Sequence, residues 1–101
     1  MNINELTRDR KLPLVVDFWA SWCAPCRQLA DDIEAIAGEF KDRIQFLRVD
    51  IDASPELAES FDIASVPTLL AIFRGQETHR LGGKISAQQL RSFLLGLSPQ
   101  R

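Results

Sequence analysis

Apolar residues follow one another along this chain in two distinct patterns. Leu14–Trp19 is an almost unbroken apolar run after Pro13. Such a run predicts a central strand that is buried on both faces of a sheet. Thr68–Phe73 is predicted as a further strand. After the first run, apolar side chains recur at spacings of four, three and four residues, which predicts one helix from about Cys23 to Lys41. The positions on this apolar stripe are Leu29, Ile33, Ile36 and Phe40.

Turn and capping residues predict where the other elements begin and end. Ile44–Val49 is predicted as a strand. Ser54-Pro55 is typical of a helix start, with serine as the N-cap and proline in the first helical position. Arg74-Gly75-Gln76 predicts a turn into a further strand that ends near Leu81, and so a hairpin.

The last helix is indicated by Ser86 and Gln89, which fit a capping box ahead of an apolar stripe. A short helix over Ile3–Arg10 has weaker signals. The predicted order is therefore α β α β α β β α. We expect an α/β fold with a mixed four-stranded sheet and helices on both of its faces, the first two strands being parallel through a right-handed crossover.

Composition limits the class of protein. With 101 residues, 46% apolar and 26% charged, the chain fits a single globular domain over residues 1–101. Its net charge of −2 argues against general affinity for nucleic acid or anionic membranes. No apolar run is long enough to cross a bilayer, and Met1–Arg10 is polar and unlike a signal peptide. We expect a cytoplasmic protein, although a mature form that has lost a leader remains open.

Cys23 and Cys26 are the only cysteines of the chain. They fit half of a metal site, a structural disulfide or a reversible thiol pair. A disulfide across two residues closes almost no loop and removes little entropy from the unfolded chain, which disfavours the structural role. Zinc needs four ligands, and His79 is the only histidine, so we expect no metal unless a site is shared between chains.

The position of the two cysteines favours the reversible thiol pair. They follow a predicted buried strand and open the long helix, where unpaired N–H groups and the helix dipole should lower the pKa of the Cys23 thiol. Pro25 suits the first helical turn because it has no N–H to leave unpaired. We expect Cys23 to be exposed and Cys26 to be shielded, as one attacking and one resolving thiol require. A C-x-x-C motif beside a βαβ pattern is itself the signature of a thioredoxin-like redox site.

Longer motifs extend this signature. Val16–Ala20 (VDFWA), Trp22–Cys26 (WCAPC), Val66–Leu70 (VPTLL) and Gly82 occur in an order and spacing that resemble the thioredoxin family from about Leu12 to the last helix. This resemblance implies a thioredoxin fold.

The resemblance also implies roles for the catalytic residues. Cys23 would be the nucleophile and Cys26 the resolving thiol, with Pro25 between them in the active site. Asp17 would be the buried acid that accepts a proton from Cys26. From the residues alone, Asp17 is an acid inside an apolar strand, where burial raises the pKa of a carboxyl group; an acid satisfied at a strand end is an equal alternative.

Other matching positions would bind the target protein. Pro67 would follow a cis peptide bond that leaves the Val66 backbone free to pair with an extended target segment. The implied substrate-binding residues are Trp22, Ala24, Val66, Pro67 and Gly82, and Trp19 would support the site.

Three departures from the family pattern change these expectations. Ala24 replaces the usual glycine between the cysteines. Arg48 replaces a lysine near the buried acid; we expect a half-buried Arg48 with its head in water, and a charge partnership with Asp17 as the weaker alternative. The N-terminus is too short for the family's first strand, so four strands rather than five are expected. The strand Ile44–Val49 would then be an open edge, which suggests pairing with another chain or membership of a longer protein.

These observations predict a thiol–disulfide oxidoreductase that reduces protein disulfides and needs no bound cofactor. The resemblance implies that thioredoxin reductase restores the dithiol, and we expect a monomer. Two alternatives remain: a disulfide oxidase or isomerase of an oxidising compartment, and a thioredoxin-fold binding module of a larger protein with weak redox activity.

Overall fold

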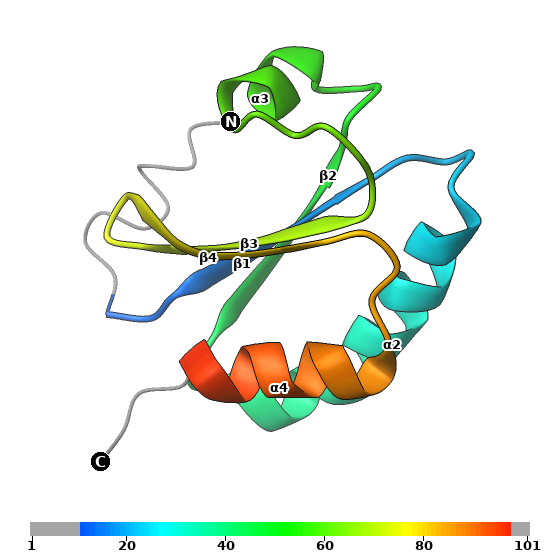
Figure 1. Cartoon of the computed structure of the whole chain (residues 1–101). Coiled ribbons are helices and arrows are strands. Elements are labelled where there is room, and N and C mark those ends of the chain that lie inside the picture. The colour runs from blue at the N-terminus through cyan, green and yellow to red at the C-terminus, as the bar shows by residue number, and fades with distance from the viewer. Residues whose placement is uncertain (1–10, 98–101) are drawn as a thin grey trace.

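A four-stranded mixed sheet forms the centre of the computed structural model, which describes residues 11–97 (Figure 1). Its strands are β1 (Leu14–Trp19), β2 (Gln45–Asp50), β3 (Thr68–Phe73) and β4 (Gln76–Gly82). They lie in the order β2-β1-β3-β4. β1 and β2 are parallel, and the other two pairings are antiparallel, which confirms the predicted mixed sheet.

Helices cover both faces of this sheet. α2 (Ala24–Phe40) and α4 (Ala87–Leu97) lie together on one face, and the short α3 (Pro55–Ser60) lies on the other (Figure 1). α2 matches its predicted bounds, with Cys23 as N-cap and Lys41 as C-cap. The helix predicted at Ile3–Arg10 lies outside the described residues.

Two apolar cores result from the alternation of side chains along the buried strands. Val15 packs with the stripes of α2 and α4, whereas Val16 and Phe18 pack with the face that α3 covers. Each fully buried leucine or phenylalanine side chain contributes roughly 1.5–3 kcal/mol. The two cores hold β1 in the middle of the sheet, and so fix the point from which the cysteine-bearing loop leaves it.

Element ends differ from the predictions by single residues. β2 starts one residue later than predicted, and β4 continues through Gly82. The capping box is confirmed: the Gln89 N–H donates to Ser86 Oγ at 3.0 Å and the Ser86 N–H to Gln89 Oε1 at 2.8 Å. Ser54 is the N-cap of α3, but its side chain makes no capping hydrogen bond.

Within residues 11–97, β2 pairs only with β1 and borders the sheet, as expected for the segment Ile44–Val49. β4 is the other border strand. Pairing of β2 with a second chain remains a prediction.

The stripe of α2 can be tested through Leu29, which is fully buried in the core between α2, α4 and the sheet. We expect Leu29→Ala to lower the free energy of unfolding by about 2–5 kcal/mol, because the lost burial is compounded by a cavity. Urea denaturation measures this. Leu95→Ala is the control, since Leu95 on α4 is 50% exposed and should change stability by about 0.5 kcal/mol at most. Equal losses in both variants would contradict the assigned packing.

Candidate active site

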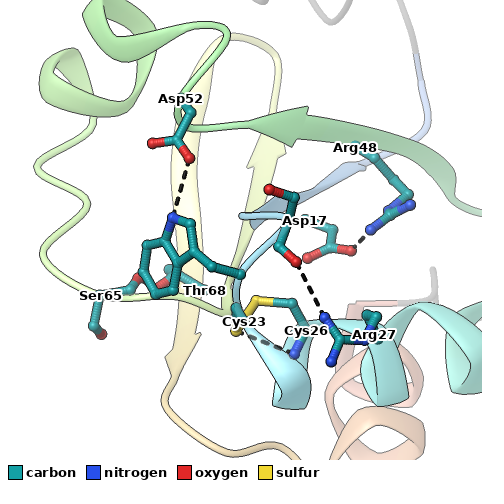
Figure 2. Close-up of a disulfide and its surroundings, with 10 residues drawn as sticks. Asp17, Cys23, Cys26, Arg27, Arg48, Asp52, Ser65 and Thr68 are labelled. Atoms are coloured by element: carbon teal, nitrogen blue, oxygen red, sulfur yellow. Dashed lines mark hydrogen bonds and ion pairs between the residues drawn. A yellow bond between two sulfur atoms is a disulfide. The ribbon is translucent and has the colours of Figure 1, made fainter.

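The two cysteines form a disulfide at the junction of β1 and α2 (Figure 2). Cys23 is the N-cap of α2 and Cys26 lies in its first turn, with their Cα atoms 5.3 Å apart. The backbone N–H of Cys26 donates to Cys23 Sγ over 3.2 Å. The sulfur of Cys23 therefore occupies the position in which a capping side chain accepts from the unpaired N–H groups of a helix start. Pro25 and Ala24, both exposed, form the first two helical positions between the cysteines.

The expected exposure of Cys23 is wrong. Cys23 is only 5% exposed and Cys26 is fully buried. The reason is that both cysteines and Ala20 form a separate small apolar cluster, against which side chains from three other segments pack. These side chains are Trp19, Ile51 and Val66. The order of burial still makes Cys23 the more accessible sulfur, but access to it depends on these neighbours.

Asp17 lies on the face of the sheet that α2 covers. Val15 points into the core beneath α2, and Asp17, two residues further along β1, shares that face. Cys26 belongs to the buried stripe of α2 and precedes Leu29 by three residues, so it too faces the sheet. Because β1 ends where α2 begins, this topology brings Asp17 beneath the first turn of α2.

The carboxyl group of Asp17 is held in a partly satisfied, buried environment. Asp17 is 2% exposed, and Oδ1 has no hydrogen-bond partner among the described residues. Burial raises the pKa of Asp17, and the hydrogen bond and charge of Arg48 oppose this rise without cancelling it. A buried carboxyl group with a raised pKa can hold and release a proton, which is the chemistry that a proton acceptor needs.

Arg48 contacts both Asp17 and Trp19. Asp17 and Arg48 are register partners in the parallel pair β1–β2, and Arg48 Nε donates to Asp17 Oδ2 over 3.2 Å (Figure 2). The Arg48 guanidinium also stacks over the Trp19 ring, 4.5 Å from its centre. The side chain remains 45% exposed, as expected, but the ion pair that we considered the weaker alternative is formed. The acid is thus linked to an aromatic ring that packs against the disulfide.

Trp22 is the most exposed large apolar side chain in the described part of the chain, at 68%. Its orientation is fixed by Asp52, whose Oδ2 accepts from Trp22 Nε1 at 3.0 Å (Figure 2). Asp52 is held in turn, because its own N–H donates to Asp50 Oδ1 at 2.9 Å. The role of Asp52 cannot be predicted from the sequence, since an acid in the turn after β2 has no distinguishing local pattern.

The peptide bond between Val66 and Pro67 is cis, as the resemblance implied. The side chain of Val66 packs against the disulfide, and within residues 11–97 its backbone N–H and C=O make no hydrogen bond. The neighbouring carbonyl groups are occupied: Ser65 accepts from Thr68 Oγ1 at 2.7 Å and Pro67 from the Gly83 N–H at 3.1 Å. Within the described residues, Val66 therefore offers an unpaired backbone N–H and C=O next to the cluster that holds the sulfurs.

Gly82 lies at the end of β4, paired with Thr68. A Cβ atom at Gly82 would meet Thr68 Oγ1 at 3.6 Å, an ordinary contact, so its immediate surroundings do not demand glycine. The next residue does require it, because Gly83 has a φ of +84°. Gly82 therefore lies beside the start of β3, and its role in binding the target stays a prediction.

Other kinds of site find little support in the described ranges. Between residues 11 and 97, no three side chains of histidine, cysteine, aspartate or glutamate come together to hold a metal ion. No helix in the same part of the chain is long and apolar enough to span a membrane.

Comparisons with known proteins agree with this geometry. The family model described as Thioredoxin matches residues 2–95. Thioredoxin 1 of Chlorobaculum tepidum is 37% identical over 93 residues, covering 92% of each chain. The Bifunctional thioredoxin reductase/thioredoxin of Mycobacterium leprae is 40% identical over 80 residues, which are 78% of this chain and 18% of that protein. The X-ray structure of Fasciola hepatica thioredoxin superimposes with a TM-score of 0.82 at 34% identity, covering 95% of this chain and 88% of that one.

The cost of burying Asp17 predicts a pH-dependent stability. With a folded-state pKa above that of the unfolded chain, Asp17 binds its proton more tightly in the folded state, so ionisation destabilises the fold as pH rises above about 4. Asp17→Asn should therefore melt a few degrees higher than the parent at pH 7. The difference should shrink toward zero as pH falls below 4. Thermal melts of the oxidised protein between pH 3.5 and 8 measure it.

The control for this experiment is Asp31→Asn, which removes an exposed carboxylate on α2 and should change the melting temperature little. A parent protein that is more stable than Asp17→Asn at pH 7 would show that the Arg48 pair outweighs desolvation.

Proposed function

The chain belongs to the thioredoxin family and is a thiol–disulfide oxidoreductase that reduces protein disulfides, and we propose that Cys23 is its nucleophile and Cys26 its resolving thiol. The observation that carries this assignment is the hydrogen bond from the Cys26 N–H to Cys23 Sγ at the N-cap of α2. In the reduced protein, the same N–H and the positive end of the helix stabilise a thiolate on Cys23. Cys26 lies inside the first turn of α2, so its sulfur does not occupy the N-cap position.

The first step is attack on the target. The Cys23 thiolate forms a bond to one sulfur of the target disulfide, the bond between the two target sulfurs breaks, and the second target sulfur leaves as a thiolate that takes up a proton. The product is a mixed disulfide between Cys23 and the target.

The second step releases the target. Asp17, as a carboxylate, accepts the proton of the Cys26 thiol through a bridging water, and the Cys26 thiolate attacks Cys23 Sγ. The mixed disulfide breaks, the target leaves with both sulfurs reduced, and the Cys23–Cys26 disulfide remains. The raised pKa of Asp17 supports this role because the carboxyl group then exchanges protons closer to neutral pH. Arg48 orients the carboxylate from the solvent side.

The target binds as an added strand. Its backbone pairs with the free N–H and C=O of Val66, next to the sulfurs. Trp22, held by Asp52, presents an exposed aromatic surface next to Cys23 in the chain. Ala24 and Pro25 are exposed at the start of α2, and Gly82 lies beside the start of β3, where the target strand would pass.

The electron donor that we propose is a thioredoxin reductase, which uses NADPH to restore the dithiol. The relative from Mycobacterium leprae supports this, since its name joins a thioredoxin reductase and a thioredoxin in one protein. We further propose that the protein works as a monomer in the cytoplasm, where regeneration of the dithiol keeps it a reductant.

Substitution of the cysteines tests the proposal directly. We expect Cys23→Ser to reduce insulin no faster than dithiothreitol alone, as followed by turbidity, because no thiolate remains at the N-cap. Cys26→Ser, the matched variant, should still attack and should accumulate a mixed disulfide with the target, visible by non-reducing electrophoresis. A Cys23→Ser protein as active as the parent would refute the assignment.

A further inference from the structure

Arg80 joins β4 to the end of α3 through its side chain. Its Nη2 donates to the carbonyl oxygen of Phe61 at 2.6 Å, and its Nη1 donates to that of Asp62 at 3.2 Å. Glu77, three residues earlier on β4, accepts from Nε at 2.8 Å and from Nη2 at 2.9 Å. The guanidinium is thus fixed in orientation by a two-point ion pair while it binds two backbone carbonyls far away in sequence.

Those two carbonyls follow directly after α3: Phe61 is its C-cap and Asp62 is the next residue. The carbonyl groups at the end of a helix carry the negative end of its dipole, so a cation is favoured there. α3 has six residues and no basic residue in its last turn. Directly after it, Asp62 has a φ of +54°, in the left-handed region that few non-glycine residues adopt. Arg80 supplies the cation that α3 itself lacks.

The segment beyond this point is the one that carries Val66 and Pro67. We call residues 61–67 the α3–β3 loop. β4 is bonded to this loop at both ends, since Arg80 donates to Phe61 and Asp62 at its start and the Gly83 N–H donates to Pro67 at its end. Between these anchors lies the free Val66 backbone. The N–H groups of Asp62 and Ile63 also bond back to α3, so β4 and α3 together hold the start of the loop, and β4 holds its end.

We propose that Arg80 is a positioning residue that holds the α3–β3 loop ready to receive the target segment. This inference rests on the proposed binding of the target to Val66. With Arg80 in place, the loop is ordered before the target arrives, so the target does not bear the entropy of fixing it. Without Arg80, the loop must be ordered when the target binds, which weakens the affinity for the target. The rate of thiol–disulfide exchange at α2 should not change.

Arg80→Ala tests the proposal through a split between binding and chemistry. With dithiothreitol as electron donor and insulin as target, we expect KM to rise about three- to tenfold and kcat to change less than about twofold. Reduction of 5,5′-dithiobis(2-nitrobenzoic acid), a small disulfide that needs no strand pairing, should keep its rate. Amide hydrogen exchange across residues 61–67 should become faster in the variant, with α2 unchanged.

Arg91→Ala is the matched control. Arg91 on α4 makes a two-point ion pair with Glu39 on α2, at 2.8 and 3.1 Å, that is more exposed than the Arg80–Glu77 pair and binds no backbone carbonyl of the loop. Its KM should equal that of the parent. Arg80→Lys retains the charge but loses the planar fork, and Glu77→Gln weakens the hold on the guanidinium; both should raise KM by less than Arg80→Ala.

The results separate this inference from the proposed function. An Arg80→Ala protein with the KM and loop exchange of Arg91→Ala would overturn the role of Arg80, and so would an equal loss of rate toward insulin and the small disulfide. If Arg80→Ala fails to fold, Arg80→Lys and Glu77→Gln provide the same comparison. The proposed function is tested separately by Cys23→Ser, which must be inactive whatever the result for Arg80→Ala.

Discussion

The unpaired N–H groups at the start of α2 are the constraint on which the site depends. A helix start attracts an acceptor with negative charge, and here the acceptor is the sulfur of Cys23. Central placement of β1 between β2 and β3 determines where this helix start can lie, since the chain leaves β1 at Trp19 and enters α2 five residues later. The two apolar cores, which hold β1 and α2 together, therefore also position the chemistry.

A second consequence of this arrangement is the buried acid. The strand that leads to the cysteines must be apolar to lie in the centre of the sheet, yet Asp17 interrupts it. Its desolvation is offset only in part by Arg48, which itself stays near the solvent and stacks on Trp19. The buried carboxyl group of Asp17 thus lowers the stability of the folded protein at a position close to the disulfide. Proteins often place groups that exchange protons at such functional sites. The intact pair of cysteines and this acid argue against a vestigial redox role.

The sequence predicted most of the fold because local patterns carry it. An unbroken apolar run predicted the bounds of β1, and the predicted strand Thr68–Phe73 matches β3. The apolar stripe predicted the length of α2, and Ser86 with Gln89 predicted the start of α4. The site was predicted less completely. Burial of Cys23 depends on packing by Ile51 and Val66. Asp52 contacts Trp22, which is 30 residues away in the sequence, and Arg80 contacts Phe61, which is 19 residues away. Such contacts leave no periodic signal, so only the folded structure reveals them.

The midpoint potential of the Cys23–Cys26 couple tests the central claim most directly. The protein is equilibrated in dithiothreitol and glutathione buffers, and its state is followed by the fluorescence of Trp19 and Trp22 with thiol trapping as a second readout. A protein-disulfide reductase should have a potential near −270 mV, about the value typical of thioredoxins and below those of disulfide isomerases. A potential of about −180 mV or higher would mean that the protein donates or rearranges disulfides, and would contradict its role as a reductant.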